Sequence, residues 1–521
     1  MNTFYYGEDH LTASIALKLA RKEIQGVFSH ETIKRIHESA DAVAQIAQGE
    51  KAVYGINTGF GPLCTSIISP EQTTTLQENL LKSHAVGVGD LIDPEISKLM
   101  MVLKIHALAQ GFSGIQFGTV ERIHWMLEND IIPIVPSQGS VGASGDLAPL
   151  SHLFLPLIGY GKVFFEGKAV ATQDILSKFE KSALKLGPKE GLALINGTQF
   201  MAAHGVRLVE RFHNLLTNAT LTGALMIEGL MGSAKPFSAD LHRLRPFAGN
   251  QHVAFTITNL LEGSEIVVSH LNCTRVQDPY SLRCIPQVHG ASWNAWLHLK
   301  ETLEIEINSV TDNPVVFNEE HTISGGNFHG QPIALTFDYA CLAISEIGNI
   351  SDRRIYLSIE GDTPGVPKLL LKETGLNSGL MIPQYTTAAL ASENKSLCFP
   401  ASADSIPTSL GQEDHVSMGS IGSRKALRVL ENVEKILGIE LFYAVQAMDF
   451  HQPLKSGPIL QKIYEFVRAR IQPITEDRIM ADDMEEAIQL IKDGVLANLA
   501  NSIAFEENHP YHTHWTEKFN F

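Results

Sequence analysis

The sequence predicts a mainly α-helical protein, with a helical head followed by an elongated helix bundle. Apolar side chains recur at three- and four-residue spacing, the period of an amphipathic helix, far more often than they alternate. The clearest segment is 422–448, where one apolar stripe contains Leu427, Leu430, Val433, Leu437, Leu441 and Ala444. The chain has 521 residues, of which 44% are hydrophobic, so it can bury a large core. We therefore expect many helices and few strands.

Further elements follow from the same patterns. A helix is predicted over 484–495, because its apolar positions keep helical spacing and the acids before and within its first turn suit the positive end of a helix dipole. Short strands are expected only in segments such as 162–170, which alternates around a Glu-Gly-Lys turn. A Gly- and Pro-rich first part gives way to longer helical segments near Gly197, which predicts domains 1–197 and 198–521.

Composition excludes several classes of function. Lys and Arg number 40 against 57 Asp and Glu, and the net charge of -17 disfavours binding to nucleic acid or an anionic membrane. The cysteines are scattered and form no CxxC pair (Cys64, Cys273, Cys284, Cys341 and Cys398), which predicts a reducing compartment. The N-terminus lacks the pattern of a secretory signal, and Pro and Gly interrupt the longest uncharged runs, so we expect a cytoplasmic protein. No metal site is expected, because HExxH is absent and the tail ENHPYHTHW is an incomplete ligand set.

The most informative segment is GSVGASGDLAPLSHLF, residues 139–154. Its glycines allow a tight backbone path, and Asp146 and Pro149 suit the opening turn of a helix. An ordinary glycine-rich turn accounts for this spacing. A phosphate-binding loop does not, because the spacing is GxxGxxG and no Lys-Ser or Lys-Thr follows.

The tripeptide Ala143-Ser144-Gly145 also permits a reaction within the chain. In a strained turn, the amide nitrogen of Gly145 can attack the carbonyl of Ala143, since both neighbours of the serine are small. Loss of water from the adduct, and loss of the Ser144 hydroxyl, would leave an imidazolone that carries an exocyclic methylidene. That group is a strong electrophile.

This segment resembles the signature of the aromatic amino acid ammonia-lyases, whose prosthetic group is this methylidene-imidazolone (MIO). The similarity continues in the blocks YGINTGFGPL (54–63), LLKSHAVGVG (80–89), LALINGTQ (192–199), VQDPYSLRCIPQVHG (276–290), SGGNFHG (324–330) and SLGQEDHVSMGS (409–420). The resemblance implies a helical lyase architecture of the fumarase/aspartase type. It also implies an MIO group formed autocatalytically from Ala143, Ser144 and Gly145 without an external cofactor, and a homotetramer whose active sites are each shared by three chains.

The resemblance implies roles for residues that carry the chemistry. Tyr54, in a Gly-rich segment that predicts a mobile loop, matches the base that removes the β-proton, a role that requires a lowered phenol pKa. Tyr280 matches the second active-site tyrosine. Arg283 is expected to bind the substrate carboxylate through its planar fork. Asp278-Pro279 predicts a helix start that places Tyr280 and Arg283 on one face.

Three further residues are assigned by resemblance. Asn196 and Gln277 match amides that support the prosthetic group and the bound amino acid, and Phe328 matches an aromatic residue beside the group. Taken alone, the amides would be ordinary backbone caps and Phe328 would be a core residue.

His84 is the first indication of the substrate. It follows Leu76 and Leu80 at four-residue spacing, on a helix predicted to begin at Ser69-Pro70-Glu71-Gln72. A satisfied core histidine fits this position, but the family places its side-chain selector there. A histidine at this place occurs in histidine- and tyrosine-specific members, so it argues mainly against phenylalanine.

Glu413 is more selective. A carboxylate accepts a hydrogen bond from an imidazole N–H, whereas against a phenyl ring it would be a desolvated, unpaired charge. The phenylalanine and tyrosine lyases carry an amide at the matching place, and Met381 lines up with a methionine of the histidine-specific members. We therefore expect a lyase that converts L-histidine to trans-urocanate and ammonia. Pro383, Ile285 and His289 depart from the pattern of the better-known bacterial histidine lyases, which puts the pocket shape in doubt.

Two alternatives stay open. A member of the same family acting on tyrosine or phenylalanine, as a lyase or an aminomutase, would keep the same electrophile. An inactive helical scaffold or binding protein would keep only the fold. The joint presence of Tyr54, Asn196, Tyr280 and Arg283 argues against the inactive scaffold.

Overall fold

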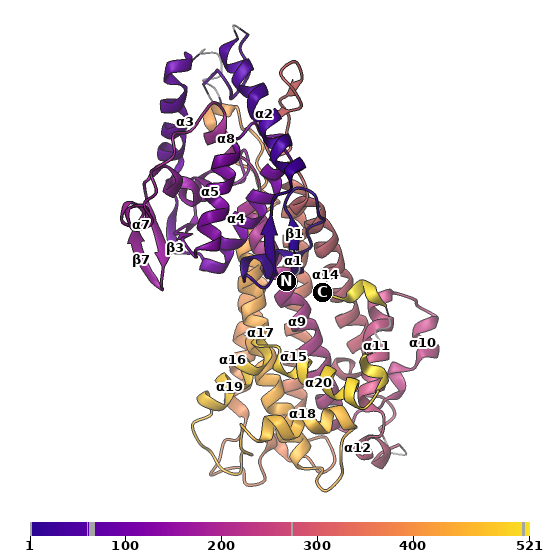
Figure 1. Ribbon diagram of the computed structural model, residues 1–521. Coiled ribbons are helices and arrows are strands. Elements are labelled where there is room, and N and C mark those ends of the chain that lie inside the picture. Colours follow the sequence, from indigo (N-terminus) through magenta and orange to yellow (C-terminus); the bar gives the residue numbers. More distant parts are fainter. Residues whose placement is uncertain (1–2, 50, 60, 62–67, 272–274, 513–515) are drawn as a thin grey trace. The chain divides into compact units, whose positions relative to one another are not determined.

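The structure is a computed structural model that describes residues 3–49, 51–59, 61, 68–271, 275–512 and 516–521 (Figure 1). Helices dominate it, and its strands form only two- and three-stranded sheets, which confirms the prediction of a mainly α protein. The chain divides into two compact units. Unit 1 contains Met1–Arg207, Leu299–Asp338 and Pro400–Arg424, and unit 2 contains Leu208–His298, Tyr339–Phe399 and Lys425–Phe521. Each unit is assembled from three segments of the chain, so this division does not test a single boundary. The boundary at residue 197 therefore stays a prediction.

Unit 1 is built mainly from the N-terminal half of the chain. Its helices are α1 (Ala13–Ala20), α2 (His30–Gln48), α3 (Pro70–His84), α4 (Pro94–Ala109), α5 (Phe117–Glu128), α6 (Leu147–Phe154), α7 (Thr172–Lys178) and α8 (Glu190–Ile195), with 3-10 turns η2 (Leu155–Ile158) and η5 (Ser409–Gly411). Its strands are β1 (Thr3–Tyr5), β2 (Gln25–Val27), β3 (Val88–Leu91), β4 (Ile132–Pro133), β5 (Pro136–Gln138), β6 (Lys162–Phe165), β7 (Lys168–Ala171), β8 (Val315–Val316) and β9 (Thr322–Ile323). The pair β1-β2 is parallel, whereas β3-β5, β4-β6-β7 and β8-β9 are antiparallel.

Unit 2 contains mostly helices. They are α10 (Ala239–Arg243), α11 (Ala248–Leu261), α12 (Glu265–Ser269), α13 (Tyr280–Arg283), α16 (Met381–Leu397), α18 (Pro458–Arg468), α19 (Ala481–Lys492) and α20 (Val495–Glu506), with 3-10 turns η3 (Lys235–Phe237), η4 (Lys368–Leu370), η6 (Pro510–His512) and η7 (Glu517–Phe519). The long helices α9 (Gln199–Gly229), α14 (Ile285–Ile307), α15 (Gln331–Ile359) and α17 (Gly419–Asp449) each have residues in both units.

Helix α4 is the core helix of unit 1. Asp93 caps it by accepting from the Glu95 amide at 2.7 Å, and Pro94 suits its first turn. Most of its residues from Ile96 to Ala109 are buried, and it packs against α1 and α5. A helix that is apolar on nearly all sides must be covered by other elements, so α4 organises the helices around it.

The structure confirms several predicted elements and corrects one. The segment 162–170 forms the β6-β7 hairpin, and 422–448 lies within α17. The predicted helix over 484–495 is wrong at its C-terminal end, because α19 stops at Lys492 and Val495 begins α20. Gly494 separates them with a φ of +66°, a left-handed conformation that ends helices.

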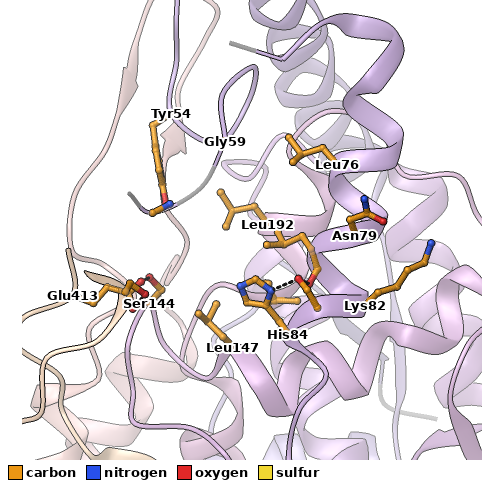
Figure 2. Close-up of a pocket in the computed structure, with 15 residues that line it drawn as sticks. Tyr54, Gly59, Leu76, Asn79, Lys82, His84, Ser144, Leu147, Leu192 and Glu413 are labelled. Atoms are coloured by element: carbon orange, nitrogen blue, oxygen red, sulfur yellow. Dashed lines mark hydrogen bonds between the residues drawn. The ribbon is translucent and has the colours of Figure 1, made fainter. Parts of the chain in front are cut away.

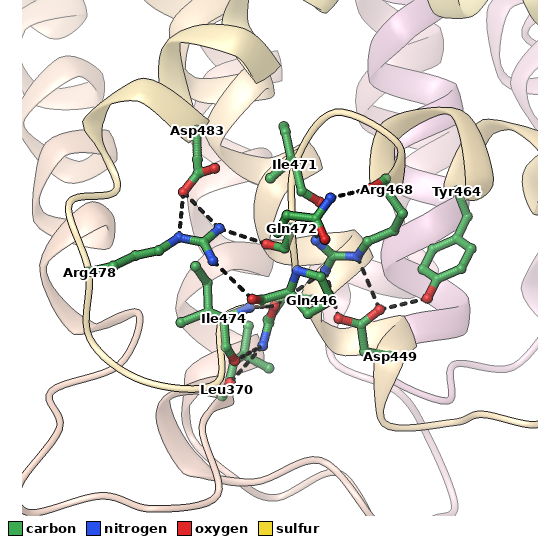
Figure 3. Close-up of polar contacts among 11 residues, drawn as sticks. Leu370, Gln446, Asp449, Tyr464, Arg468, Ile471, Gln472, Ile474, Arg478 and Asp483 are labelled. Carbon is green, nitrogen blue, oxygen red and sulfur yellow. Dashed lines mark hydrogen bonds and ion pairs between the residues drawn. The ribbon is translucent and has the colours of Figure 1, made fainter.

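A polar network joins the C-terminal helices of unit 2 to α17 (Figure 3). Arg468 and Tyr464 on α18 both donate to the Asp449 carboxylate, at 2.8 Å from the arginine Nη2 and 2.6 Å from the tyrosine hydroxyl. The buried Gln446 amide donates to the carbonyls of Leu370 and Ile474 at 3.2 and 2.9 Å. These bonds hold the backbone at Leu370 and Ile474 against α17.

Helix α15 is, among the described helices, the one long and apolar enough to cross a membrane, with a mean hydropathy of 1.3 in its most apolar window. That window is 72% buried, and a core helix passes the same test, so α15 is weak evidence for a span. Of the cysteines, Cys341 is buried and Cys284 and Cys398 are half-buried, whereas Cys64 and Cys273 lie outside the described residues.

Candidate active site

The Ala-Ser-Gly segment forms a tight turn directly before α6. Gly142, Ser144 and Gly145 have φ angles of +78°, +53° and +81°, so the serine occupies the left-handed region that side chains rarely adopt. A Cβ atom on Gly145 would lie 2.1 Å from the Gly197 carbonyl oxygen, and one on Gly142 would lie 2.3 Å from Ser417 Oγ. Only glycine fits at these two positions, and the turn is held in a strained conformation.

Backbone bonds and one carboxylate hold this turn. The Asp146 amide donates to the Gly197 carbonyl at 2.7 Å, and the Gly197 amide donates to the Ser144 carbonyl at 3.4 Å. The buried Asp146 carboxylate accepts from the Met201 amide and from Ser140 Oγ, both at 3.0 Å. Burial raises the pKa of Asp146 to about 7, although these hydrogen bonds oppose the rise.

Ser144 faces a cavity of about 750 Å³ within unit 1 (Figure 2). The cavity is lined by Tyr54, Gly59, Gly61, Leu76, Asn79, Leu80, Lys82, Ser83, His84, Ser144, Leu147, Leu192, Ile195, Ser409 and Glu413. The structure therefore brings together four predicted site residues, Tyr54, His84, Ser144 and Glu413. An aliphatic lining with a few polar groups is typical of a small-molecule site.

Glu413 is fixed by hydroxyl groups. Ser144 Oγ donates to its Oε1 at 3.1 Å, and Thr408 Oγ1 and Ser409 Oγ donate to its Oε2 at 3.1 and 2.9 Å. Figure 2 shows Ser144 beside Glu413, with His84 facing them from the end of α3. A carboxylate held in this way presents a fixed acceptor to a ligand in the cavity.

His84 provides a second polar group at the cavity. Its Nδ1 lies 2.9 Å from Ser83 Oγ. Burial lowers the pKa of His84, while the charge of Glu413 opposes the change. The helix that carries it begins after Ser69, which confirms the predicted start.

Tyr54 reaches the cavity from a turn stabilised by its own side chains. Asn57 Oδ1 accepts from the Val53 amide at 2.8 Å, and Thr58 Oγ1 accepts from the Gly55 amide at 3.1 Å. The half-buried Tyr54 hydroxyl accepts from the Gly61 amide at 3.4 Å. The rest of the YGINTGFGPL block lies partly outside the described residues.

Two other predicted residues of unit 1 lie elsewhere. Asn196 caps the C-terminus of α8 and is 2% exposed; it borders a second, much smaller cavity next to Lys104. Phe328 is half-buried in the loop before α15. Neither side chain is among the described residues that line the 750 Å³ cavity.

Unit 2 contains a second cluster of predicted residues. Arg283 Nη2 donates to Gln277 Oε1 at 3.0 Å, and its Nε donates to the Asp278 carbonyl at 2.9 Å. The guanidinium lies 4.6 Å from the centre of the Tyr280 ring, which is 71% exposed. Both residues lie on α13, which begins after Pro279 as predicted. Met381 is the first residue of α16, also in unit 2.

Sequence reasoning missed several lining residues. They are Asn79, Lys82, Ser83, Leu147, Leu192, Ile195 and Ser409. Asn79 and Ser83 share a helix face with Leu76 and Leu80, so the spacing that identified His84 could have found them. Within the described residues, no group of three or more His, Cys, Asp or Glu side chains is placed to hold a metal ion.

A mainly helical fold, a strained Ala-Ser-Gly turn and a cavity with a carboxylate and a histidine together define a helical ammonia-lyase. The family model of the aromatic amino acid lyases matches residues 11–469. The chain belongs to this family.

Individual relatives agree with this assignment. The chain is 46% identical over 499 residues to a histidine ammonia-lyase of Natranaerobius thermophilus, covering 94% of this chain and 98% of that protein. The crystal structure of histidine ammonia-lyase from Trypanosoma cruzi has a TM-score of 0.90 at 36% identity and covers 100% of this chain and 98% of that one. A tyrosine aminomutase from Streptomyces globisporus has a TM-score of 0.91 at 33% identity, covering 96% and 99%. These neighbours confirm the predicted helical lyase architecture.

Proposed function

We propose that this protein converts L-histidine to trans-urocanate and ammonia. The observation that supports this substrate is the position of Glu413, whose Oε2 is held by Thr408 Oγ1 and Ser409 Oγ at 3.1 and 2.9 Å in a cavity that also contains His84. A fixed carboxylate suits an imidazole N–H, whereas a phenyl ring would offer the Oε1 of Glu413 no donor. Relatives named histidine ammonia-lyase, at 46% and 43% identity over 94% of this chain, support the same substrate.

We further propose that Ala143, Ser144 and Gly145 form an MIO group in the mature protein. The Gly145 N–H adds across the Ala143 carbonyl, and the first water removes that oxygen together with the Ser144 amide hydrogen. The second water removes the Ser144 hydroxyl and its α-hydrogen. The positive φ angles at Ser144 and Gly145 and the absence of room for a Cβ on Gly145 fit this closure. Once formed, the group supplies an electrophilic methylidene carbon for the substrate amine.

The other residues would bind the substrate and move its proton. Tyr54, half-buried at the cavity, would take the β-proton onto its phenol oxygen. His84 and Glu413 would hold the imidazole, and Arg283 would hold the carboxylate. Tyr280 and Gln277 lie against Arg283 and would orient it.

An absorbance assay tests the substrate and the electrophile together. Purified protein with L-histidine and no added cofactor should generate urocanate, and L-tyrosine and L-phenylalanine should be much poorer substrates. Ser144→Ala should abolish turnover, and its intact mass should match its own unmodified sequence, whereas the wild type should be lighter than its sequence by two waters. Ser151→Ala is the matched control, since Ser151 Oγ only donates to the Leu147 carbonyl within α6. Turnover that survives Ser144→Ala would refute the mechanism, and a β-amino acid product would indicate an aminomutase.

We also propose a homotetramer in which different chains supply Ser144 and Arg283. In support, the residues lining the cavity belong to unit 1, whereas the exposed Gln277 and Tyr280 and the half-buried Arg283 form a cluster of unit 2. Mixing inactive Ser144→Ala and Arg283→Leu chains tests this, because random assembly would restore both groups in about a quarter of the sites. Mixtures that stay inactive after subunit exchange would place both groups in one chain.

A further inference from the structure

Lys104 is a basic residue in α4, the core helix of unit 1. It lies on α4 among buried residues, and it is 2% exposed. A lysine with no partner at such a place would cost several kcal/mol, as its charge is removed from water. The residues it contacts therefore decide what it does.

The Lys104 ammonium binds the end of another helix. Its Nζ donates to the carbonyls of Ala193 and Asn196, at 3.0 and 2.6 Å. The carbonyls in the last turn of a helix have no partner within the helix, and α8 ends at Ile195. Lys104 satisfies two acceptors there and places a cation at the negative end of the helix dipole.

The residue after Asn196 is the one that touches the Ala-Ser-Gly turn. The Gly197 carbonyl accepts from the Asp146 amide at 2.7 Å, and the Gly197 amide donates to the Ser144 carbonyl at 3.4 Å. Gly197 has a φ of +124°, and a Cβ atom on it would lie 2.6 Å from Gln199 Oε1. Both its carbonyl and its amide bond to the turn region, so a displacement of Asn196 would disturb these two bonds.

We infer that Lys104 is a positioning residue that holds Asn196 and Gly197 against the turn and so makes its cyclisation fast. The inference rests on the proposed formation of MIO from Ala143-Ser144-Gly145. Lys104 does not contact the reacting atoms and acts through one stretch of backbone. A loosened Gly197 would let the turn relax from its strained conformation, in which the Gly145 nitrogen attacks the Ala143 carbonyl.

The contact does not require a charged lysine. Burial lowers the pKa of Lys104 to about 7, while the charge of Asp312 opposes the change. A neutral amine still has two N–H groups for the two carbonyls. Lys104 therefore holds Asn196 in either protonation state, and its role is positional.

Lys189 provides a matched control in the same unit. It is also fully buried, and its Nζ pairs with Asp312 Oδ2 at 2.5 Å and donates to the Ser113 carbonyl at 3.0 Å. Lys189→Met breaks a buried ion pair and should lower stability at least as much as Lys104→Met. It leaves the bonds from Lys104 to Ala193 and Asn196 in place.

The test follows the intact mass of newly synthesised full-length chains over time. Wild type and Lys189→Met should lose two waters at similar rates once folded. Lys104→Met should lose them at least about tenfold more slowly, equivalent to about 1.4 kcal/mol in the barrier. Lys104→Gln keeps two N–H donors on a shorter side chain and should lose the two waters at an intermediate rate. It replaces Lys104→Met in the comparison if that variant does not fold.

Three outcomes would overturn the inference. Lys104→Met cyclising at the wild-type rate would show that Lys104 only contributes to the core. Equal slowing by Lys189→Met would indicate general destabilisation instead of positioning. A wild-type chain that never loses two waters would overturn the proposed MIO group as well, which distinguishes the two failures.

Discussion

Asp146 links the reactive turn to the start of α9, and its replacement by asparagine should change how stability depends on pH. The carboxyl is completely buried between Ser140 and Met201, and burial raises its pKa from 3.8 to about 7. The folded protein thus keeps this proton over a pH range in which the unfolded chain has lost it. Because the folded state binds more protons between these values, raising the pH there must destabilise it.

The size of the effect follows from the same values. A rise from 3.8 to about 7 corresponds to about 4 kcal/mol, at about 1.4 kcal/mol for each pH unit. Asparagine does not titrate, and it keeps one oxygen for the Met201 amide while its NH₂ can donate to Ser140 Oγ. Relative to Asp146→Asn, the wild type should lose about 4 kcal/mol of unfolding free energy between pH 4 and pH 7, and no more above that range.

Urea unfolding of both proteins across this pH range measures the difference, in which the other titrating groups cancel. Asp130 provides a control of opposite sign: burial alone raises the pKa of Asp130, but the bonds from Lys22 and Lys98 lower it overall. The wild type should therefore gain stability over Asp130→Asn as the pH rises through the acid range. A flat difference for Asp146→Asn would refute the reasoning, because it would mean that the hydrogen bonds to this carboxylate fully balance the effect of its burial.

Three other substitutions have defined outcomes. Gly145→Ala should prevent the loss of two waters seen by intact mass, because its Cβ would lie 2.1 Å from the Gly197 carbonyl oxygen; a fully cyclised variant would show that the turn is not held as described. Glu413→Gln should lower kcat/KM for L-histidine about 100-fold, which corresponds to the free energy of one charge-assisted hydrogen bond. Activity toward L-phenylalanine should fall less. Equal losses for the two substrates in a competition assay would show that Glu413 does not select the substrate. Arg354→Met should cost about 3–5 kcal/mol in urea unfolding, because it leaves the buried Glu440 without its cation; replacing both residues by apolar ones should cost less.

Periodicity predicted elements that bury a continuous apolar face. The α17 stripe and the alternation in β6-β7 were readable because side chains of those elements repeat with the period of the backbone. The error at Val495 has the same origin. Apolar spacing continues across Gly494, and the break is marked only by the glycine itself, which ends a helix without changing the apolar spacing.

The site was predictable only in part by spacing. The turn and the helix start at Ser69 follow from local chemistry, but Glu413 lies 269 residues after Ser144, and nothing local shows that the two meet. Resemblance to a family supplied that pairing. The role of Lys104 could not be predicted from the sequence, because its partners are backbone carbonyls 89 and 92 residues away. Every residue has a backbone carbonyl, so no residue type marks these partners.

The surroundings of the turn explain why side-chain patterns describe it so incompletely. Several of the contacts that hold it involve main-chain atoms: the carbonyl oxygen of Gly197 lies against Gly145, and the amide of Met201 binds the Asp146 carboxylate that follows the turn. In the sequence, such contacts are visible only as positions where a side chain is absent, so Gly142 and Gly145 resemble any glycine-rich turn. What distinguishes this turn is that buried polar groups confine it from outside, Asp146 at its end and Lys104 through Asn196. The rate at which the turn cyclises would then depend on Asp146 and Lys104, although neither side chain touches the reacting atoms. Substituting such a residue can slow cyclisation in a chain that still folds, which separates the two processes.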